Sequence, residues 1–211
     1  MDLDELKKPL IWALVAVAVV VAGGLVALGY ASYREHSLRQ AVAPQEQAAD
    51  THLREALSAP LEPVPDQARQ AVAKLDAAVQ DIDTRLDALR RLDAAPDPAR
   101  VAAAEESLGD AAVIVRKEAD AVRAGIAFHA ARAALVEHMR GAASRRGGWV
   151  SEAIRLKHEL DKAYFNYKFA LDAFGARLGD VPDQDLAGRV RARIDTALEH
   201  AKTELARASS H

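Results

Sequence analysis

The chain has 211 residues, of which 50% are hydrophobic and 28% are charged, and it contains no cysteine. The lack of cysteine excludes disulfides, thiolate metal sites and cysteine nucleophiles within this sequence. Beyond residue 33 there are 26 Lys and Arg against 28 Asp and Glu; this balance argues against nucleic acid as a partner, because binding to phosphates usually requires a basic excess.

A run of 25 residues without a charge extends from Pro9 to Tyr33, after a short tail at residues 1–8. In helical form such a run can cross a bilayer, because about 20 apolar residues span a hydrocarbon core of about 30 Å. Trp12 and Tyr30 lie near its two ends, and aromatic residues at such positions are typical of membrane interfaces. The sequence therefore predicts a transmembrane helix at residues 9–33.

The alternative for this segment is a secretory signal, with Ala27-Leu28-Gly29 as a small-residue cleavage site. We favour an uncleaved anchor, because the apolar core of a signal is usually only about 7–15 residues long. Two lysines precede the run and two arginines follow it closely, so the positive-inside rule gives nearly a tie. We expect the short tail in the cytoplasm and the larger part of the chain on the extracytoplasmic side of the inner, or cytoplasmic, membrane.

Residues 34–58 are predicted to continue as a juxtamembrane helix, interrupted near Pro44 because proline removes a backbone donor. Residues 59–65 contain three prolines and predict a stiff Pro-rich linker. Residues 66–93 show the clearest helical periodicity. Apolar residues recur there at spacings of three and four, with charged residues between them, as in a heptad seam. The seam consists of Val72, Leu75, Val79, Ile82, Leu86 and Leu89.

Three further helices are predicted, at residues 98–140, 149–178 and 183–208. Asp97 is expected to cap the first of them, ahead of Pro98. The short connections favour antiparallel neighbours. The predicted fold class is therefore all-α: an N-terminal transmembrane helix followed, at residues 66–208, by an antiparallel up-and-down helical bundle with coiled-coil-like packing. The heptad seam would serve equally in an intermolecular coiled coil.

A basic stretch joins two of the predicted helices. Its members are Arg140, Arg145, Arg146, Arg155 and Lys157, with Trp149 among them. Glu152 is the one acidic residue in this stretch, which leaves a local net charge of +4. Because Arg and Trp are enriched at interface hot spots, we predict a contact with an acidic protein surface or with lipid headgroups. The alternative is an ordinary interhelical loop with Trp149 folded over the end of the bundle.

An aromatic cluster follows, with five of the eight Phe and Tyr residues of the chain: Tyr164, Phe165, Tyr167, Phe169 and Phe174. Helical spacing places Tyr164, Tyr167 and Phe174 on one side, whereas Phe165 and Phe169 form a pair on another side. Burial of this helix against two neighbours would explain both sides. A partner groove or a pocket for a small ligand is the alternative.

Signals for metal, cofactor or catalytic chemistry are weak. His138, His158 and His200 are predicted at similar heights in the bundle, but on outward faces, and the Glu-x-x-His pairs of di-metal bundles are absent. No Gly-rich phosphate loop, nucleophile elbow or zinc-protease helix motif occurs in the sequence. We therefore expect no metal, no cofactor and no enzymatic activity.

The function predicted from these features is that of a single-pass, membrane-anchored helical scaffold or assembly subunit in the cell envelope. Its expected partners are the membrane, other envelope proteins and further copies of itself. The alternative is a ligand-binding helical sensor domain. Because the tail before the anchor has only eight residues, such a sensor would require a separate signalling partner.

Overall fold

The protein is described from a computed structural model. It describes the backbone of residues 3–61, 65–92, 96–141 and 148–209, with side chains from residue 27 onward except at residues 62–66, 68, 93–95, 142–147 and 209–211. Within these ranges the chain is all-α. The helices are α1 (Leu3–Ser58), α2 (Pro65–Arg90), α3 (Pro98–Arg140), α4 (Trp149–Arg177) and α5 (Gln184–Ser209), with a short 3-10 turn (Leu178–Asp180) before α5.

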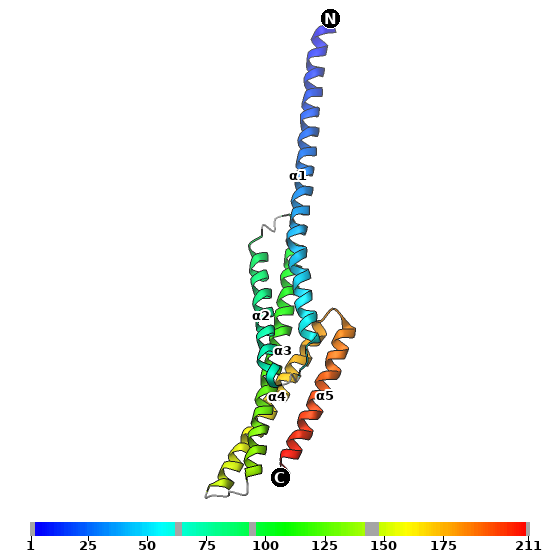
Figure 1. Ribbon diagram of the computed structural model, residues 1–211. Helices are drawn as coiled ribbons and strands as arrows, with labels where there is room; N and C mark the ends of the chain where they lie inside the picture. The colour runs from blue at the N-terminus through cyan, green and yellow to red at the C-terminus, as the bar shows by residue number, and fades with distance from the viewer. Residues whose placement is uncertain (1–2, 62–64, 93–95, 142–147, 210–211) are drawn as a thin grey trace.

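The helices form an elongated rod in which consecutive helices run in opposite directions (Figure 1). The long helix α3 contacts all four of the others. At one end of the rod α1 and α2 pack on α3, and at the other end α4 and α5 do so (Figure 1). The N-terminal part of α1 extends well beyond the rest of the rod (Figure 1).

Helix α1 is continuous through Pro44, so the predicted interruption at this residue is wrong. Pro44 is exposed, and buried residues lie on both sides of it along the helix, namely Leu38, Val42, Ala49 and Leu53. A proline in a helix interior removes one hydrogen bond. Packing of this apolar stripe against the rod keeps α1 helical despite that loss, since tertiary contacts supply most of a helix's stability.

The core is built mainly from Leu, Ala, Val and Ile. In the predicted heptad seam, Leu75, Ile82 and Leu89 are buried. The other three seam residues are half-buried and pack against the same core: Val72, Val79 and Leu86. Since α2 packs on α3 and α1 of the same chain, the seam lies within the rod.

Two aspartates define the beginnings of helices. The Asp97 carboxylate accepts a hydrogen bond from the Arg100 backbone N–H at 3.0 Å, and Pro98 occupies the first turn of α3. Asp183 accepts one from the Leu186 backbone N–H at 2.9 Å before α5. Such caps satisfy backbone donors that have no partner inside the helix.

The predicted transmembrane run lies on α1. Its residues 9–26 have side chains outside the described part of the chain. Among the residues that are described, no helix combines the length and the apolar character needed to cross a bilayer. The membrane anchor therefore stays a prediction, whereas the helical conformation of this segment from Leu3 onward is part of the structure.

Candidate interaction surfaces

The basic stretch is less basic in three dimensions than in sequence. Arg155 forms ion pairs with Glu152 at 2.5 Å and with Glu159 on the next turn of α4. The hydrogen bond from Arg155 lowers the pKa of Glu152, and the same bond raises the pKa of Arg155. Arg140 and Lys157 are exposed. Arg145 and Arg146 lie outside the described residues.

Trp149 begins α4 and is half-buried. Its indole stacks on the His138 ring, with centroids 5.2 Å apart and an interplanar angle of 18°. The Nε2 of His138 donates a hydrogen bond to the Trp149 carbonyl at 3.0 Å. These contacts join the end of α3 to the start of α4, so Trp149 lies against the end of the bundle, as the alternative reading of this stretch expected.

The aromatic cluster is divided between the core and the surface. Tyr167 and Phe174 are fully buried, and Tyr167 stacks on Phe128 of α3 with ring centroids 6.0 Å apart. Phe165 and Phe169, in contrast, are 66% and 76% exposed. Burial against two neighbours therefore explains only one of the two sides, and the five rings do not line a common groove.

Close packing of α3 on α4 depends on Gly125. A Cβ at this position would lie only 3.0 Å from the Tyr167 ring. The missing side chain leaves space for the buried ring beside the α3 backbone. This use of glycine outweighs the cost of about 1 kcal/mol that glycine imposes in a helix interior.

An unexpected surface is the outer face of α4, which we define as Val150, Ile154, Phe165 and Phe169 with the residues between them on that side. Val150 and Ile154 are 62% and 65% exposed. The buried residues of α4 lie on the opposite side of the helix: Leu156, Leu160, Tyr167, Leu171 and Phe174. The sequence shows Val150 and Ile154 at a spacing of four, but a spacing alone does not tell which side of a helix faces solvent.

Two surface grooves accompany α3. The first has a volume of about 440 Å³ between α3 and α4 and is lined by three alanines and by side chains of both charges. Its lining consists of Asp120, Arg123, Ala124, Ala127, Glu159, Lys162, Ala163 and Asn166. The second groove, of about 280 Å³, lies between α1, α3 and the turn before α5 and is rich in carboxylates. Among the described residues no group of three or more acidic or histidine side chains could hold a metal ion.

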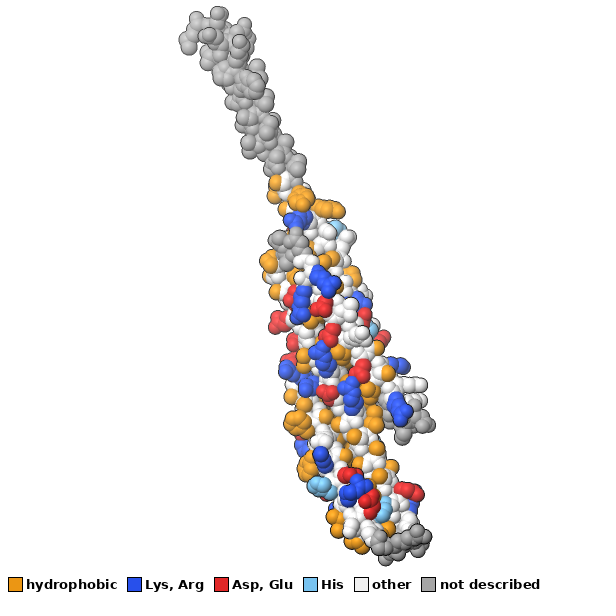
Figure 2. All heavy atoms as spheres, turned by 90° about the vertical axis from the view of Figure 1, so that its left-hand side faces the viewer, with side chains coloured by type: hydrophobic (Ala, Val, Ile, Leu, Met, Phe, Trp, Pro, Cys, Tyr) orange, Lys and Arg blue, Asp and Glu red, His pale blue; other side chains and the backbone are white. Residues whose placement is uncertain are grey.

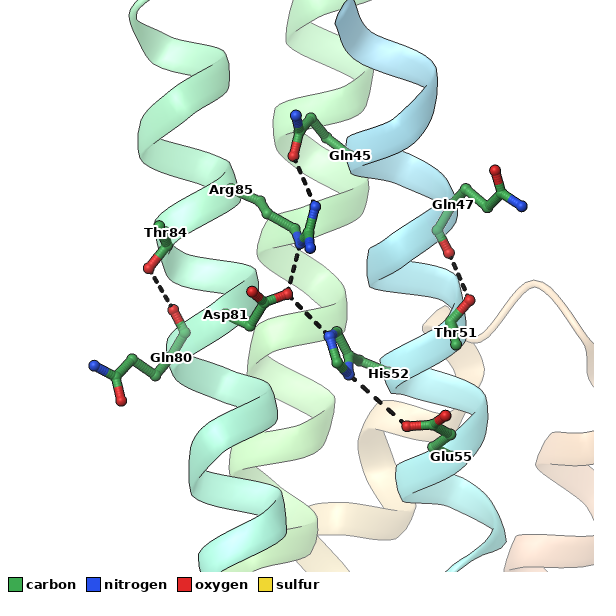
Figure 3. Close-up of polar contacts among 9 residues, drawn as sticks. All are labelled: Gln45, Gln47, Thr51, His52, Glu55, Gln80, Asp81, Thr84 and Arg85. Carbon is green, nitrogen blue, oxygen red and sulfur yellow. Dashed lines mark hydrogen bonds and ion pairs between the residues drawn. The ribbon is translucent and has the colours of Figure 1, made fainter.

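A polar network joins α1 to α2 (Figure 3). His52 of α1 donates from Nε2 to the Asp81 carboxylate at 2.9 Å, and Arg85 donates from Nε to the same carboxylate oxygen at 2.5 Å. Arg85 also reaches Gln45 of α1 at 3.1 Å. The hydrogen bond from Arg85, assisted by the one from His52, lowers the pKa of Asp81 despite partial burial. The network holds α1 against α2 through contacts between residues 29 and 40 positions apart in the sequence.

Ion pairs also join α2 and α1 to α3. Arg116 and Arg123 of α3 pair with Asp83 and Asp76 of α2, and Arg100 of α3 pairs with Glu46 of α1 at 2.5 Å. Charged side chains of both signs interleave along the middle of the rod (Figure 2). Each exposed pair contributes little stability, on the order of 0–1 kcal/mol, but together they select one alignment of the helices.

Glu118 of α3 is a buried ionisable residue. Its side chain is 1% exposed, and its Oε2 has no hydrogen-bond partner among the described residues. Burial raises the pKa of Glu118 from 4.5 to about 8, and the nearby Arg193 guanidinium offsets this only in part. Glu118 lines neither of the two grooves, so it is not placed to exchange a proton with a ligand there.

Arg193 of α5 binds the backbone carbonyls at the C-terminal end of α1. Its guanidinium donates to the Leu57 carbonyl at 2.7 Å and also to the Ala59 carbonyl. The last carbonyls of a helix have no partner within it, and a cation there interacts favourably with the helix dipole. Sequence reasoning missed the proximity of Glu118 and Arg193.

One signal for the burial of Glu118 was available in the sequence. Glu118 follows Val115 by three positions and precedes Val122 by four, and this spacing places its carboxyl group on the buried side of α3.

Comparisons with protein-family models, with curated proteins and with solved structures found no significant match to this chain.

Proposed function

We propose that the chain is a single-pass membrane protein whose helical rod is a scaffold or assembly part of the cell envelope. The observation that carries the proposal is the position of the uncharged run: it lies on the part of α1 that extends beyond the rod (Figure 1). Leu38 is the first buried residue of the described part of α1. The helical residues before it span roughly 50 Å at ~1.5 Å per residue, enough for a bilayer of about 30 Å and a short stem.

The surface at the base of this extension fits a membrane interface. Leu28, Tyr30 and Tyr33 are 69%, 63% and 70% exposed. The Arg34 guanidinium lies over the Tyr30 ring, 5.8 Å from its centroid. Tyrosines and a following arginine at the end of an apolar run are typical of the level of lipid headgroups.

A scaffold has to be held rigidly relative to its membrane anchor, and α1 is one continuous helix from the uncharged run into the rod. The same helix that carries the uncharged run is packed against α2, α3 and α5. The Asp81 network holds it to α2, and Arg193 holds its end to α5. The rod would therefore stand at a fixed distance from the membrane and offer its outer surfaces to partners.

The experiment is membrane fractionation of the full chain followed by an alkaline carbonate wash. We expect the wild-type chain to stay in the membrane pellet. The double variant Val20→Arg/Val21→Arg should be released, because each arginine near the centre of a transmembrane helix costs about 2.5–3.5 kcal/mol of insertion free energy. Ala192→Arg, at an exposed position of α5, is the matched control and should stay in the pellet. Release of the wild-type chain by the wash would contradict the proposal.

The groove between α3 and α4 favours the second candidate function, a ligand-binding sensor. Its volume of about 440 Å³ lies within the range of small-molecule sites, roughly 300–1,000 Å³. The mixed charges of the lining would suit a small zwitterion. Thermal unfolding of the full chain with a panel of amino acids tests this function. Stabilisation by one of them, abolished by Ala163→Trp in the groove lining, would support the sensor, and no shift with any of them would contradict it.

A further inference from the structure

The exposed apolar residues of the rod are concentrated on one helix. Seven large hydrophobic side chains are exposed among the described residues. Three of them, at residues 28–33, lie at the base of the predicted anchor, and the other four all belong to the outer face of α4. Contiguous apolar surface of this kind on a folded chain usually marks an interaction site.

The four side chains form a stripe along α4. A residue advances by about 100° around a helix, so Ile154 and Phe165, eleven positions apart, fall on nearly the same side after three turns. Val150 and Phe169 extend the stripe by one turn at each end. The exposed His158 lies between the two apolar pairs. The stripe therefore covers about five turns, a length suited to packing against another helix.

We infer that the outer face of α4 is covered by α4 of a second copy of this chain, in a parallel pair about a two-fold axis along the rod. The parallel direction rests on the proposed function, because both copies of α1 must then enter the same bilayer from the same end of the rod. An antiparallel pair would send the two anchors in opposite directions. Confinement of both copies to one membrane also raises their effective concentration.

The charges beside the stripe are self-complementary under this symmetry. Asp161 and Lys162 are adjacent in sequence, so they lie about 100° apart around α4 at nearly the same height, on either side of the line through His158 and Phe165. A two-fold axis parallel to α4 brings Asp161 of each copy opposite Lys162 of the other copy, which gives two equivalent ion pairs. Neither residue forms an ion pair with another described residue of its own chain, although Asp161 is half-buried and Lys162 is exposed.

The two exposed phenylalanines supply about half of the area that a dimer needs. A phenylalanine side chain offers on the order of 200 Å². At exposures of 66% and 76%, Phe165 and Phe169 of both copies would together cover roughly 570 Å². That is about half of the ~1,000 Å² expected for a specific interface. Val150, Ile154 and the charged flanks extend the contact.

Cysteine cross-linking tests the pairing, since the natural chain has no cysteine. Ser151 is exposed on the outer face of α4 near its start, and Ser151→Cys leaves all four apolar residues in place. In a parallel pair the two Ser151 positions meet, and oxidation of membranes that contain the full-length variant should produce a disulfide-linked dimer. Ala77→Cys, at an exposed position of α2, is the control for random collisions and should not cross-link.

The outcomes separate this inference from the proposed function. Adding Phe165→Ser and Phe169→Ser to the Ser151→Cys chain should abolish the dimer while the helical circular dichroism signal is retained. Absence of cross-linking at residue 151 in chains that remain membrane-bound would overturn the dimer and leave the anchor intact. A dimer mass without cross-linking at this position would overturn the parallel direction, and cross-linking to a different protein would overturn a second copy as the occupant.

A charge exchange gives an independent check. Asp161→Lys alone places like charges across the interface, and we expect dimerisation to weaken roughly tenfold, the sum of two exposed pairs. Lys162→Asp alone should have a similar effect. The double variant Asp161→Lys/Lys162→Asp recreates both ion pairs and should restore dimerisation. If the single variants dimerise as well as the wild type, the proposed pairing of these two residues is wrong.

Discussion

Replacement of Glu118 by glutamine is expected to make the protein more stable at alkaline pH. The side chain is 1% exposed, and burial raises the pKa of Glu118 from 4.5 to about 8. Between these two values the folded chain holds a proton that the unfolded chain releases. Stability therefore falls as pH rises through this window, by about 1.4 kcal/mol per pH unit and by on the order of 5 kcal/mol in all.

Glu118→Gln keeps the shape of the protonated carboxyl group and cannot ionise, so it removes this loss. The assay is urea unfolding of the full chain in mild detergent, followed by circular dichroism, at about pH 5, pH 7 and pH 9. The stability of the variant relative to the wild type should increase by roughly 4 kcal/mol from about pH 5 to about pH 9. Because the variant is compared with the wild type at each pH, the contributions of all other titrating groups to stability cancel.

Glu204→Gln is the matched control, because Glu204 is also buried, at 5% exposure, but it forms ion pairs with Arg132 and Arg207. Loss of its charge leaves the half-buried Arg132 without its carboxylate, and we expect a destabilisation of roughly 1–3 kcal/mol at neutral pH. The two substitutions should thus have opposite signs at and above neutral pH. A difference between Glu118→Gln and the wild type that stays constant with pH would refute the reasoning.

Three further predictions concern the packing of the rod and are measured by the same unfolding assay. Gly125→Ala should lower stability by about 1–3 kcal/mol, because its Cβ would meet the Tyr167 ring at 3.0 Å. Gly109→Ala on the same helix, where an added Cβ would meet no neighbouring side chain or helix within 4 Å, should raise stability by about 1 kcal/mol; equal effects at both glycines would contradict this account. Asp81→Asn should be destabilising at neutral pH. Folding lowers the pKa of Asp81 below its ordinary value of 3.8, so the stability advantage of the wild type over the variant should vanish as pH falls through and below 3.8. A variant that stays less stable than the wild type in acid would argue against the network. Leu75→Asp places a charge in the buried seam and should abolish cooperative melting, so an unchanged melting curve would show that the seam is misassigned.

The helical boundaries were accessible from sequence because their causes are local. The start of α3 is set by the Asp97 cap and by the prolines at residues 96 and 98, independently of the tertiary contacts of the helix. The stop of α4 near Gly179 and Pro182 is of the same kind. Pro44 is the instructive exception: the local rule predicts a break, and burial of the neighbouring apolar residues of α1 keeps the helix continuous.

The candidate surfaces were accessible only in part. Helical spacing separated Phe165 and Phe169 from Tyr167 and Phe174, but both pairs have the same chemical character. Which pair faces the core depends on where α3 lies relative to α4. The neutralisation of Arg155, in contrast, is local: Glu152 and Glu159 lie three positions before it and four positions after it on the same helix, and this spacing by itself indicates the ion pairs.

Composition, apolar periodicity and the positions of proline and glycine determined by themselves that this chain is helical and, apart from the predicted break at Pro44, where most of its helices begin and end. These properties depend on interactions within a few residues along the chain. The tertiary structure alone decided that α3 is shared by all the other helices, that Glu118 is buried near Arg193, and that the apolar stripe of α4 faces outward. Each of these depends on contacts between residues far apart in sequence, and helical periodicity gives the faces of a helix without giving the neighbours that cover them.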